Sequence, residues 1–198
     1  MNTPNKLTVF RILLVPLMII VSLINIPGTV LGDPTKFFII DIIFIIGSLT
    51  DKLDGYLARK NNEVTNFGKF LDPIADKILV ISAMLILVEA GRLPSWIPII
   101  IIMREFAVSG YRLIAVQEKG EVIAASMWGK IKTVTQMIAI ILALLDTNKF
   151  GAIFVSELTG MSFVLNLLST ILMIVCTIAT IFSGWDYLKN GKDLLNTK

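Results

Sequence analysis

Long apolar stretches alternate with short polar segments along the whole chain. Six stretches carry few charges, namely residues 12–31, 37–50, 78–90, 93–116, 131–145 and 161–181. A helix needs about 20 mostly apolar residues to cross a bilayer. The pattern therefore predicts an all-α membrane protein with six transmembrane helices and a single domain over residues 1–198. The first stretch lacks a clear cleavage site and five more follow it, so we expect a retained span and not a signal peptide.

A short polar segment precedes the first apolar stretch. Thr3, which stands before a proline, is typical of a helix start. Asn5, Thr8 and Arg11 follow at helical spacing, so these three side chains share one face. We expect a short amino-terminal interfacial helix over about residues 3–11 that leads into the first span.

Glycine, proline and asparagine mark the ends of the other predicted helices. The second and third spans are expected at about residues 37–60 and 68–90, with a short inner turn between them. The fourth span ends near residue 117 and the fifth begins near residue 128. An outer loop follows at about 146–160. The sixth span ends near residues 186–187, and a polar tail covers about 189–198.

The composition limits the chemistry that the chain can perform. Hydrophobic residues make up 55% of the 198 positions, charged residues only 17%, and the mean hydropathy is +0.80, which is too apolar for an ordinary soluble domain. The chain has no histidine and one cysteine, Cys176, so an internal disulfide and a zinc–thiolate cluster are excluded. Metal or acid–base chemistry must therefore depend largely on carboxylates, which favour Mg²⁺, Mn²⁺ or Ca²⁺.

The basic residues are distributed unevenly between the two predicted membrane faces. If the six spans alternate in direction, 14 of the 18 Lys and Arg residues fall on one side. Lys36, Arg92 and Lys149 fall on the other side, and Arg104 lies within a span. Because cytoplasmic segments are enriched in Lys and Arg, this bias predicts that both termini are cytoplasmic.

Four aspartates interrupt the ends of the second and third predicted spans. Asp51 and Asp54 are three residues apart, and Asp72 and Asp76 are four apart, so each pair lies on one helix face. The short connecting turn makes the two helices antiparallel neighbours, so the four carboxylates should converge at the cytoplasmic end. Each charged Asp at mid-bilayer costs about 2.5–3.5 kcal/mol, and less near the interface. The cluster therefore predicts a bound hard cation such as Mg²⁺.

These residues also form a pattern that resembles a known family signature. The run Asp51-x-x-Asp54-Gly55-x-x-Ala58-Arg59, followed after eight residues by Gly68-x-x-x-Asp72-x-x-x-Asp76, is similar to the signature of the CDP-alcohol phosphotransferases at all eight signature positions. The resemblance implies six transmembrane helices, a homodimer and a polar cavity open to the cytoplasm. It also implies a CDP-linked donor with CMP as the leaving group.

The resemblance implies roles for individual residues. Asp51, Asp54, Asp72 and Asp76 would bind one or two Mg²⁺ (or Mn²⁺) ions, and Asp76 would also act as the general base. Arg59 is either a ligand of the donor phosphate, which we favour, or a cation reaching the membrane surface. The remaining residues implied at the CDP donor are Thr8, Arg11, Gly55, Ala58 and Gly68.

Other segments narrow the resemblance to one bacterial branch of the family. Residues 5–11, 104–112, 129–136 and 183–187 are similar to those of enzymes that use CDP-diacylglycerol as donor and sn-glycerol 3-phosphate as acceptor. The acceptor carries a phosphate dianion and requires cations. The candidate ligands of that phosphate are Ser109, Arg112, Lys132 and Gln136, followed by Arg104 and Lys130.

Two of these candidates have structural alternatives. Arg104 lies deep in a span and could equally form an ion pair with Glu105 or Asp41. Lys130 could be an ordinary basic residue of the cytoplasmic face. Asp41 lies outside the signature and receives no role.

Three alternative functions remain open on the sequence. The acceptor could be serine or inositol phosphate, and serine carries no phosphate dianion to require Arg112 and Lys132. A metal-ion transporter would hold its aspartates near the midplane with a path to both faces, whereas these aspartates cluster at one end. A scaffold protein with a degenerate site is disfavoured by the intact signature.

Overall fold

The computed structural model describes the backbone of residues 3–30, 32–60, 66–119 and 126–190. Side chains at 51–60 and 66–70 lie outside the description, as do some near other segment ends. The described residues form six α-helices: α1 (Thr3–Leu23), α2 (Thr35–Lys60), α3 (Asn66–Glu89), α4 (Trp96–Lys119), α5 (Met127–Leu145) and α6 (Gly160–Asn190).

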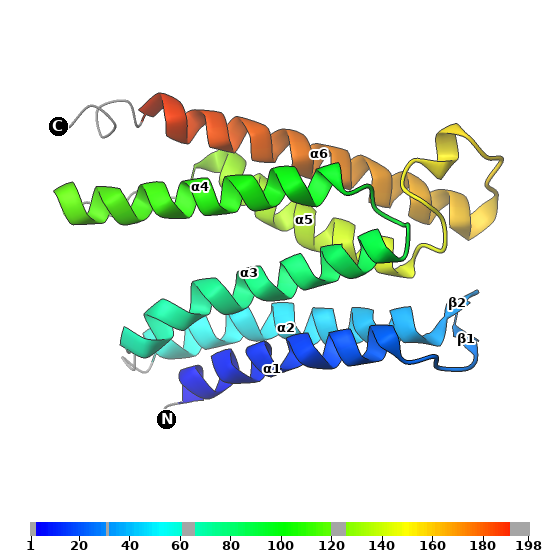
Figure 1. The fold of residues 1–198 in the computed structure, drawn as a ribbon, viewed down its shortest axis with the longest axis horizontal. Helices are drawn as coiled ribbons and strands as arrows, with labels where there is room; N and C mark the ends of the chain where they lie inside the picture. The colour runs from blue at the N-terminus through cyan, green and yellow to red at the C-terminus, as the bar shows by residue number, and fades with distance from the viewer. Residues whose placement is uncertain (1–2, 31, 61–65, 120–125, 191–198) are drawn as a thin grey trace.

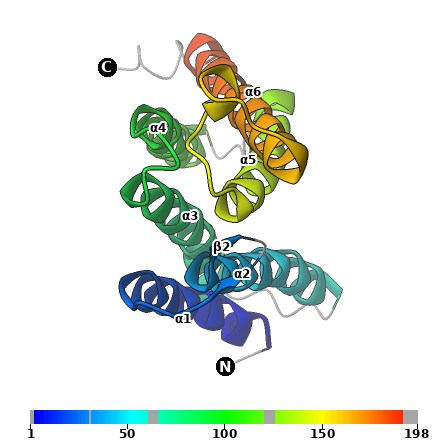
Figure 2. The ribbon, with the colours of Figure 1, turned by 90° about the vertical axis from the view of Figure 1, so that its right-hand side faces the viewer.

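The helices form two groups of three. Helices α1, α2 and α3 lie together on one side of the molecule, and α4, α5 and α6 lie together on the other (Figures 1 and 2). The start of α1 and the end of α6 lie at the same end of the molecule in Figure 1, and the β1–β2 segment lies at the opposite end. The chain crosses between the groups in the short turn after α3, where Gly91 adopts a φ of 71°.

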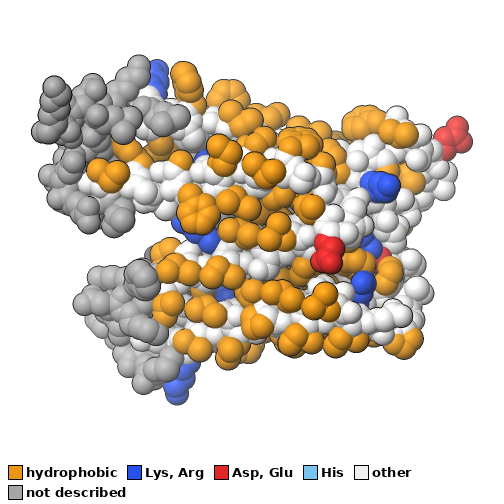
Figure 3. Space-filling model, in the orientation of Figure 1, with side chains coloured by type: hydrophobic (Ala, Val, Ile, Leu, Met, Phe, Trp, Pro, Cys, Tyr) orange, Lys and Arg blue, Asp and Glu red, His pale blue; other side chains and the backbone are white. Residues whose placement is uncertain are grey.

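The elements agree with an all-α membrane protein. Within the described residues, Asn5–Leu23, Met127–Leu145 and Gly160–Tyr187 are long and apolar enough to cross a membrane. Helices α2, α3 and α4 have 24 to 26 residues, but charged residues interrupt their apolar stretches. Large apolar side chains such as Leu13, Ile99 and Ile181 are exposed on the outside of the helices, and apolar side chains cover much of the visible surface in Figure 3.

One hydrophobic core connects both groups of helices. It contains Phe44 of α2, Leu79 of α3, Ile101 of α4, Leu144 of α5 and Met173 of α6, each at most 1% exposed. Lipid chains are as apolar as these side chains, so close van der Waals packing, more than expulsion of water, must hold the helices together.

A glycine permits one of the close contacts between helices. A Cβ atom on Gly47 of α2 would lie only 2.6 Å from the Leu79 side chain of α3 and 3.4 Å from that of Leu14 in α1. Any larger side chain at this position would require the Leu79 side chain to move. Gly47 therefore helps to set the spacing of the group that carries the aspartates.

The predicted amino-terminal segment over about residues 3–11 leads directly into the first span, and its position at the membrane interface stays a prediction. Helix α1 runs without interruption from Thr3 to Leu23. Asn5, Thr8 and Arg11 do share one face, but that face is buried, with exposures of 7%, 1% and 0%. The polar stripe packs against neighbouring helices, so α1 needs no break between a surface segment and a span. Pro16 removes only one backbone donor, and the helix continues through it.

The loops predicted to lie on the outer side contain more structure than the sequence predicts. The expected turn near Gly32 is part of a short antiparallel pair, β1 (Thr29–Val30) with β2 (Asp33–Pro34). The 146–160 loop contains a 3₁₀ helix, η1 (Ala152–Phe154). Helix α6 extends to Asn190, a few residues past its predicted end.

Candidate functional site

Two of the four signature aspartates have described side chains, and both belong to α3. Asp72 and Asp76 lie about one turn apart, and α3 remains helical through the intervening Pro73. The Thr8 hydroxyl of α1 donates a hydrogen bond of 2.5 Å to Asp72 Oδ1. The structure thus brings Thr8 to the aspartate helix, and its role at the donor stays a prediction.

The rest of the signature lies outside the described side chains. Asp51 and Asp54 belong to the carboxyl-terminal part of α2, and the resemblance adds Gly55, Ala58 and Arg59 there and Gly68 at the start of α3. The convergence of all four carboxylates therefore remains a prediction. Arg11, one helical turn after Thr8, is fully buried within α1.

A polar cavity of about 170 Å³ lies between α3, α4 and α5. Figure 3 shows a hollow between the two groups of helices, with Lys and Arg side chains on its walls. Four cations and two carboxylates line the cavity, so cations exceed carboxylates by two. The charged lining residues are Asp76, Lys77, Arg104, Glu105, Arg112 and Lys132.

Glu105 lies at the centre of the charged contacts. Its Oε1 atom is 2.7 Å from Lys132 Nζ of α5 and 2.9 Å from Arg104 Nη1 of α4. Its Oε2 atom is 3.9 Å from Lys77 Nζ of α3. Lys77 also donates a short hydrogen bond to the Ser109 hydroxyl of α4. Cations from three helices therefore meet at one carboxylate on the cavity wall.

Helix α6 orients the two arginines. Arg104 donates to the Ser183 hydroxyl, and Arg112 donates to the Tyr187 hydroxyl. A Cβ atom on Gly129 of α5 would lie 3.2 Å from Arg104 Nη2, so the glycine leaves room for the guanidinium. The 129–136 and 183–187 motifs thus support the arginines in addition to supplying Lys132.

Most of the predicted acceptor residues meet at this cavity. Arg104, Arg112, Lys132 and Gln136 line it, while Ser109 binds Lys77. The structure does not place Lys130 with them: this side chain is exposed and is not part of the lining. Lys130 and Lys132 are two residues apart, about 200° around a helix, so they point to different sides of α5.

The two interpretations of Arg104 turn out to be compatible. Arg104 pairs with Glu105, as its structural alternative predicts, and it also lines the cavity. Asp41 is not its partner: the Asp41 carboxyl is 3% exposed, and none of the described residues forms a hydrogen bond with its Oδ1 atom.

Sequence reasoning assigned no site role to Lys77 or Glu105. Lys77 follows Asp76 directly, and in the sequence it resembles the other basic residues near helix ends. Glu105 lies on the same helical stripe as Ser109 and Arg112, which was the available signal. The contact between Lys77 and Glu105 joins α3 to α4 and depends on the tertiary arrangement.

The described part of the site offers hard oxygen donors for a metal. Asp72 and Asp76 are carboxylates, the ligand type that Mg²⁺ and Mn²⁺ prefer. Among the residues whose side chains are described, no three acidic, cysteine or histidine side chains are grouped to hold an ion. The two α3 aspartates fit such a site, and the α2 aspartates would have to complete it.

Known proteins resemble this chain in sequence over nearly its whole length. The sequence profile of the CDP-alcohol phosphatidyltransferases matches residues 1–182. The CDP-diacylglycerol–glycerol-3-phosphate 3-phosphatidyltransferase of Bacillus subtilis is 44% identical, covering 99% of this chain and 98% of its own. Proteins of the same name from Haemophilus influenzae and Rickettsia bellii are 36% and 35% identical; they cover 98% and 96% of this chain and 95% and 96% of their own. The chain belongs to the CDP-alcohol phosphatidyltransferase family.

Proposed function

We propose that this membrane enzyme transfers the phosphatidyl group of CDP-diacylglycerol to sn-glycerol 3-phosphate, forming phosphatidylglycerol phosphate and CMP, and is thus a phosphatidylglycerophosphate synthase. The names of relatives that match nearly the whole chain support this assignment. The observation that carries it is the cavity itself. Asp76, the predicted base, lines the same space as four cations that suit an acceptor phosphate.

The donor would bind at the end of the site that contains the signature aspartates. Asp51, Asp54, Asp72 and Asp76 would hold one or two Mg²⁺ or Mn²⁺ ions, which neutralise charge on the diphosphate and on the departing CMP. The Thr8 hydroxyl holds Asp72 in a fixed orientation. The other residues proposed at the donor are Arg11, Gly55, Ala58, Arg59 and Gly68.

The acceptor phosphate would bind at the other side of the cavity. Arg112 and Lys132 come from different helices, and Arg104 and Gln136 line the wall near them. Guanidinium and ammonium groups are strong hydrogen-bond donors to phosphate oxygens. This arrangement would direct the acceptor hydroxyl toward Asp76.

The chemical step then follows from the positions of these groups. The acceptor hydroxyl oxygen attacks the β-phosphorus of CDP-diacylglycerol and forms a new P–O bond. The bond from that phosphorus to the oxygen of CMP breaks, and CMP leaves with the electron pair. Asp76 takes the hydroxyl proton. Because the reactants are held in one cavity, positioning and electrostatic stabilisation supply most of the acceleration.

The proposed function also requires an orientation in the membrane. We propose that all six helices span the bilayer within one domain and that both termini and the cavity face the cytoplasm of a bacterial cell. The excess of Lys and Arg on one predicted face supports this orientation. A homodimer is proposed from the family resemblance alone.

Two rival functions predict different sites. Serine as acceptor would leave the excess of cations without a phosphate partner, whereas inositol phosphate would use them in the same way. A metal-ion transporter would need a path between both membrane faces, and the described aspartates instead lie toward one end of α3.

A release assay separates these possibilities. Purified protein in detergent is incubated with CDP-diacylglycerol, Mg²⁺ and one acceptor at a time, and CMP is measured. We expect release with sn-glycerol 3-phosphate well above that with serine or inositol phosphate. Release with another acceptor but not with sn-glycerol 3-phosphate would overturn the assignment, and omission of metal tests the metal dependence.

A further inference from the structure

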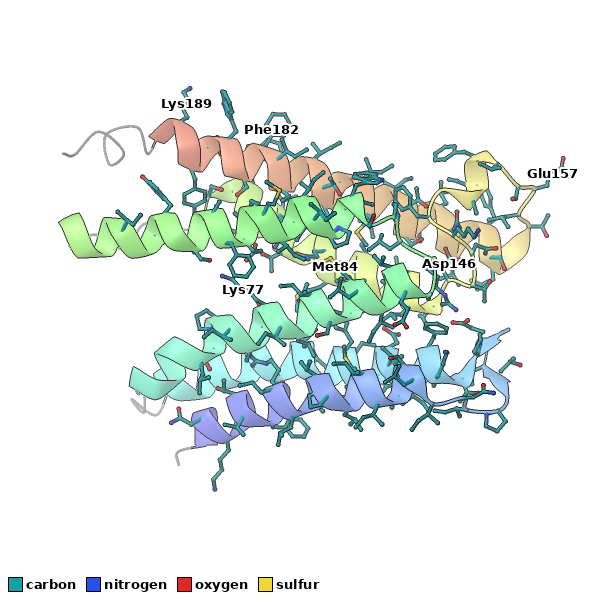
Figure 4. All side chains as sticks on the ribbon, in the orientation of Figure 1. Lys77, Met84, Asp146, Glu157, Phe182 and Lys189 are labelled. Atoms are coloured by element: carbon teal, nitrogen blue, oxygen red, sulfur yellow. The ribbon has the colours of Figure 1, made fainter. Side chains whose placement is uncertain are left out.

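Glu105 is a carboxylate with no role in the proposed reaction, yet it lies where the cavity cations converge. Its side chain is 17% exposed, and those of Lys132 and Arg104 are 7% and 12% exposed. Lys77 reaches the same carboxylate from α3, and Figure 4 shows it extending toward α4 and α5. Glu105 thus links three helices at the wall of the acceptor side.

Removing this carboxylate would leave three like charges close together with little water. Lys77, Arg104 and Lys132 repel one another, and low solvent exposure strengthens that repulsion. Their shared contact with Glu105 offsets it and fixes where each cation lies. Because an ammonium has three N–H donors and a guanidinium has five, contact with one carboxylate does not exhaust them.

We propose that Glu105 is a positioning residue of the acceptor subsite. It holds Lys77, Arg104 and Lys132 in the arrangement in which their remaining N–H groups bind the acceptor phosphate, and it thereby adds Lys77 to the phosphate ligands. The inference rests on the proposed function, because it assumes a phosphate-bearing acceptor in this cavity.

The charge balance of the cavity gives the same arrangement a role in acceptor choice. With Glu105 and Asp76 present, cations exceed carboxylates by two. A phosphate monoester carries a charge of about −1.5 to −2 at neutral pH. Such an acceptor matches the excess, whereas an acceptor without phosphate leaves the cations uncompensated. Glu105 therefore sets both the geometry and the net charge of the subsite.

The test compares Glu105→Gln and Glu105→Asp with the unchanged enzyme in the CMP-release assay. Gln removes the charge and retains the shape, so we expect the KM for sn-glycerol 3-phosphate to rise about tenfold or more. The KM for CDP-diacylglycerol should stay within about twofold, a change below half a kcal/mol. Asp keeps the charge and should recover part of the acceptor affinity. The inhibition constant of inorganic phosphate, used as a competitive inhibitor, should rise in parallel with the acceptor KM.

The controls separate this inference from folding and from the proposed function. Glu157→Gln, the same change at an exposed position of the outer loop (Figure 4), should leave both KM values unchanged. A purely structural Glu105 would lower the active fraction and hence kcat while leaving the acceptor KM constant, and that result would overturn the inference. An equal rise in both KM values would also overturn it.

A double-variant cycle gives a second measurement if Glu105→Gln is poorly folded. Glu105→Asp is combined with Lys77→Met, which removes one of the cations that Glu105 holds. We expect the combined effect on the acceptor KM to be smaller than the product of the single effects, because both changes act on one contact. Independent effects would refute the inference. An unchanged enzyme that releases no CMP with sn-glycerol 3-phosphate would instead refute the proposed function.

Discussion

Two polar clusters, one buried and one half-buried, lie toward opposite ends of the helices, and they are built differently. The cavity cluster is the group of charges around Glu105, and the outer cluster is the group around Arg92 and Asp146. Figure 4 labels Lys77 of the cavity cluster and Asp146 of the outer cluster. In the outer cluster Arg92 pairs with Asp33, with 2.9 Å from Nη1 to Oδ2, and also donates to the Leu144 carbonyl. The guanidinium stacks 3.7 Å from the centre of the Phe37 ring. Each charge there has a protein partner.

Asp146 is satisfied in the same way without a cation. One oxygen accepts from the backbone and side-chain nitrogens of Asn148, at 2.9 and 3.0 Å. The other accepts from Asn166 at 2.7 Å and Ser169 at 3.2 Å. The neighbouring cavity is only about 10 Å³, too small for anything larger than a water molecule.

The cavity cluster has what the outer cluster lacks: space and surplus charge. It borders a cavity of about 170 Å³, and its cations outnumber its carboxylates. Burial of charged groups therefore does not by itself mark a functional site. A cluster that satisfies itself stabilises the fold, whereas one with an excess of one sign beside an open space is arranged for a ligand of the opposite sign.

The largest expected effect is on catalysis in the cavity. Asp76→Asn removes the proposed base and should lower kcat about 10²- to 10⁴-fold while leaving the melting temperature unchanged. CMP release measures kcat, and thermal unfolding in detergent measures the melting temperature. Glu89→Gln, an exposed carboxylate at the other end of α3, is the matched control. Retained turnover in Asp76→Asn would remove that residue from the base role.

The next largest effect should fall on stability at the outer end. Arg92→Met leaves the buried Asp33 carboxylate without its cation, which costs about 3–5 kcal/mol. The melting temperature should fall clearly, while both KM values of the remaining folded enzyme stay constant. Lys149→Met removes an exposed cation nearby and should change neither quantity. A change in acceptor KM without a loss of stability would contradict the structural role of this cluster.

A smaller effect, on the acceptor KM, should distinguish Lys132 from Lys130 in α5. Lys132→Met removes a buried cation from the cavity and should raise the acceptor KM about 10- to 100-fold, because hydrogen bonds to charged groups contribute about 1.5–3 kcal/mol. Lys130→Met removes an exposed cation two residues away and should have little effect. Steady-state kinetics with varied sn-glycerol 3-phosphate measures both. Equal effects of the two changes would argue against the cavity as the phosphate site.

The smallest expected effect concerns the donor side. Thr8→Val keeps the side-chain shape but removes the hydroxyl that donates to Asp72, so the carboxylate is less firmly oriented. We expect a rise of about three- to tenfold in the KM for CDP-diacylglycerol, and no change in the KM for the acceptor. Thr135→Val, which removes a hydroxyl that donates to carbonyls of its own helix, is the control. An effect confined to the acceptor KM would contradict the donor-side position of Thr8.

The sequence alone determined the class of protein and most of its elements. Apolar stretches of sufficient length predict helices because backbone groups in a bilayer must be satisfied within the helix itself. The bounds of α2 to α5 follow from the same rule and from the turn residues between them. The sequence also determined the aspartate signature, because spacings of three and four residues on one helix are local facts. The sequence also indicated that Asn5, Thr8 and Arg11 share one face of α1, but the burial of that face became visible only in the structure.

Only the tertiary structure decided which charges meet. The stripe of Glu105, Ser109 and Arg112 is visible in the sequence, but its contacts with Lys77 and Lys132 join three helices that no local spacing relates. Lys130 and Lys132 look alike in the sequence, and their different exposure follows from how α5 is rotated against its neighbours. Likewise, Arg92 looks in the sequence like any other basic residue between helices, and only the fold brings Asp33 beside it. Helix formation depends on neighbours along the chain, whereas the pairing of buried charges depends on neighbours in space.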